Sequence, residues 1–205
     1  MANTQAIAAV TSAITDLLRS SYQPARFNGV AAEFEPYTST DFQNPMQTGV
    51  SCFLYRVFFH GSSRTPAGRL TADGRRKTTL PLELHLLLTV WSPDAIFQQR
   101  LAGWMMRVLE DHPLLPAGLL NARMPGAFRP DETVEITIAE LSTEDLLRIW
   151  ETLDTAVFQL SIPYLVRVLA IESVQTEGEG VPSVAERVQS FGRLPGDDEA
   201  PGASP

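Results

Sequence analysis

The sequence predicts an α+β fold in which a mainly antiparallel sheet is packed by helices. Two long apolar runs, Val50–His60 and Thr78–Trp91, are rich in aromatic and β-branched residues and indicate neighbouring antiparallel strands. Helical and strand patterns alternate irregularly along the chain, without the regular rhythm of a doubly wound parallel sheet. The 205 residues fit one domain of ordinary size followed by a tail.

Three segments have helical patterns. Residues 4–20 carry one apolar stripe, and Asn3 or Thr4 is a plausible N-cap. Ser92 is the predicted N-cap of a second helix that continues to about Asp111, with proline next to the cap. Ser142 opens a third helix, and Trp150 lies on its apolar side. If Trp150 is buried, its replacement by Ala should cost on the order of 3 kcal/mol.

The remaining strands are shorter or less regular. Residues 30–36 indicate a short strand, and residues 134–138 alternate as a half-buried strand does. Leu160–Ile171 is the last strand, where Pro163 predicts an edge position or a bulge. Because Val50–His60 is apolar on both faces, we expect cover on both sides, and its excess of aromatic residues indicates that part of it forms a subunit interface.

A long basic loop is predicted between these two apolar strands. Five of the 16 basic residues fall within 14 positions, and Asp73 is the only acid among them. A loop of this length is unusual unless it is functional or disordered by itself. Three interpretations remain open: a solvated hairpin tip, docking to an acidic protein surface, or binding to nucleic acid or lipid. The candidate partner-binding residues are Arg64, Arg69, Arg75, Arg76 and Lys77.

We divide the chain into an α+β domain at residues 1–174 and an acidic Gly/Pro-rich tail at 175–205, which we expect to be disordered. The net charge of −8 argues against a general nucleic-acid binder. The longest apolar stretch, Leu84–Trp91, is too short to cross a bilayer, and the N-terminal residues do not form a signal peptide. A protein that is made and folded in the cytoplasm is expected.

The sequence offers no recognisable catalytic pattern, so we predict no catalytic site, metal or cofactor. His60 and His85 lie in the two apolar strands and could face each other, but neither has a further ligand at metal-binding spacing. Asp111-His112 imitates part of a triad, although a histidine there more often caps the helix. Cys52, inside an apolar strand, is expected to serve packing.

The order of these segments resembles the terminator, or cap, proteins of extracellular and phage-tail-like contractile injection systems. The resemblance covers about residues 4–172. It is carried by the N-terminal helix, by Val50–Phe59, by Arg75–Trp91, by Gln99–Gly103 and Asp111–Pro113, by Leu141–Trp150, and by the closing strand Leu160–Val168.

The resemblance implies a tail-terminator-like fold and a structural role. Six copies would form a ring over the end of the inner tube, stop its growth and anchor the last sheath ring. The implied partners are further copies of this chain and the tube and sheath proteins, with no nucleic acid and no stable membrane insertion. Assembly would take place in the cytoplasm, on a tail-like particle that is released or stays inside the cell. The alternatives are another structural adaptor of a tube or baseplate, a small protein-interaction module, or an enzyme with an unrecognised site.

Overall fold

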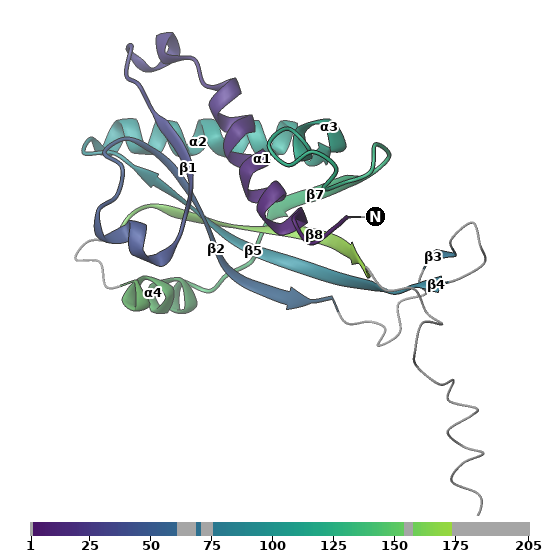
Figure 1. Cartoon of the computed structure of the whole chain (residues 1–205). Helices are drawn as coiled ribbons and strands as arrows, with labels where there is room; N and C mark the ends of the chain where they lie inside the picture. The colour runs from purple at the N-terminus through teal and green to yellow at the C-terminus, as the bar shows by residue number, and fades with distance from the viewer. Residues whose placement is uncertain (1, 61–68, 71–75, 154–157, 174–205) are drawn as a thin grey trace, which may run out of the picture.

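The computed structural model describes residues 2–60, 69–70, 76–153 and 158–173, and it has an α+β architecture (Figure 1). A six-stranded sheet has the order β1-β2-β5-β8-β7-β6, and only the β1–β2 pair is parallel. A separate two-stranded ribbon pairs β3 with β4. The strands are β1 (Glu33–Tyr37), β2 (Gly49–Phe59), β3 (Arg69–Leu70), β4 (Arg76–Lys77), β5 (Thr79–Trp91), β6 (Leu114–Pro116), β7 (Thr133–Ile138) and β8 (Ser161–Glu172).

Helices cover the two faces of the sheet unequally. Figure 1 shows α1, α2 and α3 on one face and α4 on the other. The first group packs into the main core, whereas α4 and a 3-10 helix, η2, hold a smaller cluster. The helices are α1 (Ala6–Ser21), η1 (Pro24–Phe27), η2 (Ser39–Gln43), α2 (Ala95–Asp111), α3 (Ala117–Leu120) and α4 (Thr143–Thr152).

The two long helices form where the sequence predicts them, but their caps differ. The residue at the N-cap of α1 is Gln5, without a side-chain cap, and Asn3 Oδ1 accepts a hydrogen bond from the Gln5 N–H at 2.8 Å. The N-cap of α2 is Asp94 rather than Ser92, because the Asp94 carboxylate accepts from the Phe97 N–H at 2.6 Å. Ser92 instead binds the Asp94 N–H at 3.1 Å and so supports the cap.

The predicted antiparallel pairing of the two apolar strands is confirmed. The β2–β5 register joins Gly49 to Trp91 at one end and Phe59 to Leu82 at the other. One bulge interrupts it between Leu54 and Arg56. Gly49 has φ +153°, and a Cβ there would lie 2.0 Å from the Glu33 carbonyl oxygen, so only glycine lets β1 approach β2 this closely.

The last strand is not at the edge of the sheet, which corrects the expectation from Pro163. β8 lies between β5 and β7, and its register shift against β5, between Leu82 and Leu84, is far from Pro163. The Pro163 carbonyl accepts from the Ala139 N–H at 3.0 Å, just beyond the end of β7. The nitrogen of Pro163 therefore faces the side on which β7 has ended, and no strand bond is lost there.

The smaller cluster seals the face opposite the main core at one end of the sheet. Phe42 of η2, Trp91 of β5 and Trp150 of α4 are buried together with Leu153. Trp150 is 4% exposed, which confirms that it is core. The Ser142 hydroxyl accepts from the Asp145 N–H at 3.0 Å, so the predicted cap of α4 is also confirmed.

The division into residues 1–174 and a tail at 175–205 falls partly outside the described residues, since the structure describes nothing after residue 173. Within the described ranges no helix combines the length and the apolar content needed to cross a bilayer.

Candidate docking surface

The outer half of β2 presents an open strand edge. β1 pairs with β2 only from Gly49 to Phe53, and no other described strand pairs with the outer edge from Leu54 to Phe59. The His60 N–H donates to the Pro81 carbonyl of β5 at 3.0 Å. Because backbone groups alternate along a strand, the N–H and C=O groups of Val57 and Phe59 point away from β5. An open edge of this kind can pair with another chain.

Large apolar side chains are exposed along this edge. Val57, Phe58 and Phe59 are 43%, 49% and 38% exposed. The expectation that Val50–His60 is covered on both faces is therefore correct for the inner half only. β1 stops pairing at Phe53. The buried residues of the smaller cluster beneath α4 come from η2, from β5, from α4 and from Leu153, which follows α4, and none of them comes from the outer half of β2. The outer half is the exposed part to which the predicted subunit interface would belong.

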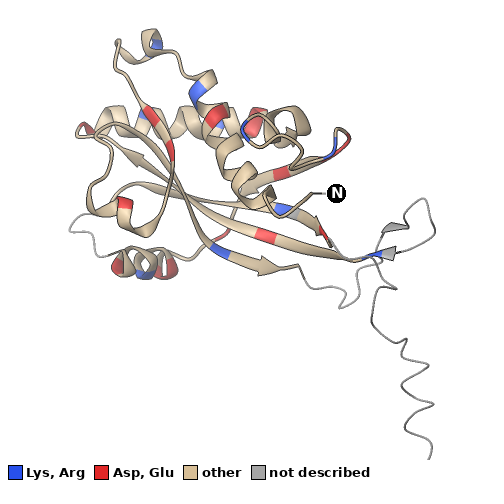
Figure 2. Cartoon of the chain, viewed as in Figure 1, with Lys and Arg blue, Asp and Glu red and all other residues tan. Residues whose placement is uncertain are grey.

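A free cation stands beside these side chains. The Arg56 guanidinium lies 4.5 Å from the centre of the Phe58 ring, a cation–π contact. Arg56 is exposed and makes no ion pair with any described residue. The neighbouring acidic residue, Glu83, is paired with His60 instead, since the His60 Nδ1 atom lies 2.8 Å from Glu83 Oε1. In Figure 2 a basic position stands on β2 and an acidic one on the adjacent β5.

The predicted basic residues are only partly described. Arg64 and Arg75 lie outside the described residues. Arg69 and Arg76 belong to β3 and β4, where Arg69 is in register with Lys77 and Leu70 with Arg76. Lys77 is half-buried, close to the start of β5. The ribbon brings Arg69, Arg76 and Lys77 together along the backbone, and docking by these residues stays a prediction.

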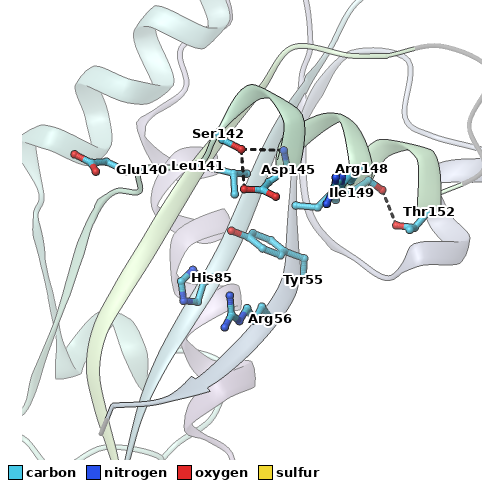
Figure 3. A pocket seen from close by; sticks show the side chains of 10 residues that line it. All are labelled: Tyr55, Arg56, His85, Glu140, Leu141, Ser142, Asp145, Arg148, Ile149 and Thr152. Atoms are coloured by element: carbon cyan, nitrogen blue, oxygen red, sulfur yellow. Dashed lines mark hydrogen bonds between the residues drawn. The ribbon is translucent and has the colours of Figure 1, made fainter. Parts of the chain in front are cut away.

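A recess of about 530 Å³ separates α4 from the exposed face of β2 and β5 (Figure 3). The bulge turns both Tyr55 and Arg56 towards it, opposite His85. The Tyr55 and His85 rings meet edge to face, with centroids 5.9 Å apart. From α4, Asp145 and Arg148 line the other wall.

The recess lacks the hydrogen bonds of a catalytic set. Ser142 and Asp145 bond each other, with Ser142 Oγ 2.7 Å from Asp145 Oδ2, as part of the helix cap. No described hydrogen bond joins either residue to His85, and Tyr55 stands between them in Figure 3. Burial lowers the pKa of His85, with a smaller contribution from the charge of Arg56. This shift favours the neutral form of the His85 imidazole.

The other histidines and the cysteine have structural surroundings. His60 and His85 do not form a pair, since His60 bonds Glu83 and His85 lies opposite Arg56. His112 Nδ1 lies 2.9 Å from the Val108 carbonyl, so its expected role at the end of α2 is confirmed. Burial raises the pKa of Cys52 to about 12, and its thiol is a packing group. No group of three metal-ligating side chains occurs among the residues that the structure describes.

The comparison that decides the family covers most of the chain. Residues 9–185 match the family model described as the Pvc16 N-terminal domain. The chain belongs to this family. A search of curated proteins finds no match to the sequence.

Solved structures share the fold of this Pvc16 N-terminal domain. One is the sheath/tube terminator of an extracellular contractile injection system, PVC, in the extended state, with 18% identity and a TM-score of 0.54 over 99% of this chain. Another is the tube-terminating cap of the anti-feeding prophage, with 17% identity and a TM-score of 0.55 over 84% of this chain. The present chain spans 66% and 57% of the lengths of those two chains.

Proposed function

We propose that this chain is a structural cap of a contractile injection system, which ends the inner tube and anchors the last ring of the sheath. The observation that carries this proposal is its membership of the Pvc16 N-terminal domain family over residues 9–185. The shared fold with a sheath/tube terminator and a tube-terminating cap supports the same role. The role requires binding surfaces and no chemical step, so the chain is not an enzyme in this proposal.

Physically, a growing tube end presents unpaired strand edges and apolar patches to the next ring. A ring of matching symmetry that covers them, and offers no further surface for addition, ends growth. Six copies of this chain would form that ring. The open edge at Leu54–Phe59 supports the proposal, because it supplies unpaired backbone and apolar side chains for contact with a neighbouring subunit.

The basic residues would contribute a second contact. Arg64, Arg69, Arg75, Arg76 and Lys77 would reach an acidic surface on the tube, the sheath or a neighbouring copy. Since the chain as a whole carries a net charge of −8, nucleic acid is not the proposed partner, and no cofactor is proposed. Assembly would occur in the cytoplasm, on a tail-like particle.

The recess under α4 favours one alternative. A volume of about 530 Å³ with an aromatic wall and both signs of charge could hold a short peptide, as in an adaptor or interaction module. The alternative predicts that substitutions in the recess abolish function while the open edge of β2 tolerates change. The cap proposal predicts instead that substitutions at the open edge of β2 abolish function while the recess tolerates change.

The proposal is tested by removing the chain from an otherwise complete particle. Without it, we expect tubes of irregular length and loss of the sheath, both seen by electron microscopy. Return of the wild-type chain should restore a narrow distribution of lengths. Particles of normal length and normal sheath occupancy in the absence of the chain would overturn the proposal.

The basic segment is tested with two matched variants of three charges each. Arg75, Arg76 and Lys77 are changed to Gln in one, and the exposed residues Arg26, Arg100 and Arg107 in the other. We expect the first variant to lose incorporation into particles while its melting temperature is unchanged. Equal incorporation of the two variants would remove the docking role of the basic segment. The more drastic deletion of Arg64–Lys77 should abolish incorporation and leave the fold intact.

A further inference from the structure

We infer that neighbouring copies of this chain join head to tail through opposite edges of the sheet, with the open half of β2 on one copy against the β6–β7 edge of the next. The inference rests on the proposed ring and names the surfaces that close it. The occupant of the open edge is therefore a second copy of the same chain.

The two surfaces lie at opposite ends of the strand order. β1 and the outer half of β2 form one end, and β7 and β6 form the other. On β7, the Ile136 N–H donates outward to the Pro113 carbonyl at 2.8 Å. Because backbone groups alternate along a strand, the next N–H and C=O groups of β7 that point away from β8 are those of Ile138. Ile138 lies beyond the end of β6, so these groups have no described partner on that side. Two different edges are what a repeating, heterologous contact requires.

Exposed apolar side chains gather at these two edges. The β2 edge contributes three of them, and the β6–β7 edge contributes Leu114 and Ile138, which are 57% and 45% exposed. The other exposed large apolar residues in the described part of the chain lie on further segments, and two of them, Leu147 and Phe158, line one shallow pocket beside Trp150. They are Val30, Leu80, Ile96, Leu147 and Phe158.

The segments of sequence at the two edges differ in charge. Six of the 16 Lys and Arg residues lie between positions 56 and 77, with Asp73 as the only acid there. The rest of the chain therefore carries ten basic residues against 23 acids. Around β6 and β7 the exposed charges include Glu110, Glu135 and Glu140, with Arg167 of β8 in register with Glu135, and Asp111 is paired with Arg107. Figure 2 shows an acidic position on β7.

The open edge of β2 could meet either a second β2 edge or the β6–β7 edge of the next copy, and charge distinguishes these two arrangements. Two β2 edges facing each other would bring the exposed Arg56 of each copy together, and like charges disfavour that contact. The β2 edge against the β6–β7 edge brings a basic apolar surface to an acidic apolar one. Repetition of this contact turns every copy in the same sense and closes a ring if the rotation fits.

The proposed contact between the β2 edge and the β6–β7 edge is weak, because β6 is short. β6 has three residues and carries proline at Pro116, with Pro113 directly before it, so few N–H groups are free to pair. A short contact of this kind gains strength when another structure holds the copies close together. The ring is therefore expected to form on the tube end and at high concentration of the free chain.

Cysteine cross-linking tests the contact in the full chain. Val57→Cys and Ile138→Cys are combined in one variant, and a short bismaleimide is added to particles purified with the chain and to the concentrated free chain. The native Cys52 is buried and its pKa is about 12, so it does not compete. We expect a ladder of covalent multimers from the double variant and monomer from each single variant. A control pair on exposed apolar positions elsewhere, Ile96→Cys with Leu147→Cys, should stay monomeric.

Two results would overturn the inference. Dimers formed efficiently by Val57→Cys alone would mean that β2 edges face each other. A double variant that is incorporated into particles yet remains monomeric would mean that the two edges do not meet. Incorporation and tube length are measured on the same particles, so a failed cross-link with normal capping refutes the edges and leaves the proposed function standing. If the wild-type chain is absent from particles, the proposed function fails, and the concentrated free chain alone then tests the contact.

Discussion

The two halves of β2 are similarly apolar in sequence but differ in their surroundings. From Gly49 to Cys52 every residue is buried, between the main core on one face and the smaller cluster on the other. From Arg56 to Phe59 every residue is exposed. The difference teaches that covering elements, and not the strand's own composition, decide which apolar residues belong to a core and which remain available for a partner.

The largest expected change in stability comes from the smaller cluster, which covers one face of the inner half of β2. Trp150→Ala should lower the free energy of unfolding by about 3 kcal/mol, because it opens a cavity in the cluster beneath Trp91 and Phe42. Urea unfolding measures the change. Leu147→Ala is the control on the same helix, at a 46% exposed position, and should change stability by less than about 0.5 kcal/mol. Equal effects would place Trp150 outside the core.

The two halves of β2 are compared most directly by making the same substitution at one valine in each half. Val50 is 1% exposed and Val57 is 43% exposed. Val50→Ala should cost about 2 kcal/mol, whereas Val57→Ala should cost less than about 0.5 kcal/mol in the free chain. Both values come from chemical denaturation. If Val57→Ala destabilises the free chain as much as Val50→Ala, the outer half of β2 is packed within one copy.

A smaller effect is expected at the cap of α2, one of the helices that cover the inner half. Asp94→Ala should cost about 1 kcal/mol, because the Phe97 N–H loses its acceptor. Asp94→Asn, which keeps an acceptor oxygen, should recover most of the loss in thermal unfolding. A loss of the same size in both variants would show that the negative charge, rather than the hydrogen bond, stabilises the helix.

The smallest effect is electrostatic and depends on pH. Hydrogen bonds from Arg123 to Asp16, at 2.6 Å each, lower the pKa of that carboxyl below its ordinary 3.8. A lowered carboxyl pKa stabilises the fold above pH 3.8, and this contribution is lost as the pH falls through the native value. The stability difference between wild type and Asp16→Asn should therefore shrink on acidification. A constant difference in urea titrations across that range would contradict it.

Local patterns were sufficient to predict most of the elements. The stripe in α1, the Ser142 cap and the pairing of β2 with β5 follow from spacing and residue type, because such interactions lie within a few residues or between two long apolar runs. The interior position of β8 could not be predicted in this way. Pro163 argued for an edge, and only the length of β7, which ends just before that point, makes the proline harmless.

The candidate surface was predicted less completely. The sequence indicated that the aromatic strand has more apolar residues than one core needs, and it located the basic residues from Arg64 to Lys77. It gave no signal for the recess, since Tyr55 and Arg56 face α4 only because a bulge turns both of them to one side. It also gave no signal for Ile138, which is exposed because β6 is too short to cover it.

Taken alone, the sequence determined the long helices and strands, where charge is concentrated and that the chain carries apolar surface beyond the needs of a single core. Those properties depend on side-chain periodicity and composition. Only the tertiary structure decided where that surplus lies, since exposure at Val57 and Ile138 depends on where β1 and β6, distant along the chain, stop pairing. Pairing ends are set by the packing of whole elements, and no local pattern encodes them.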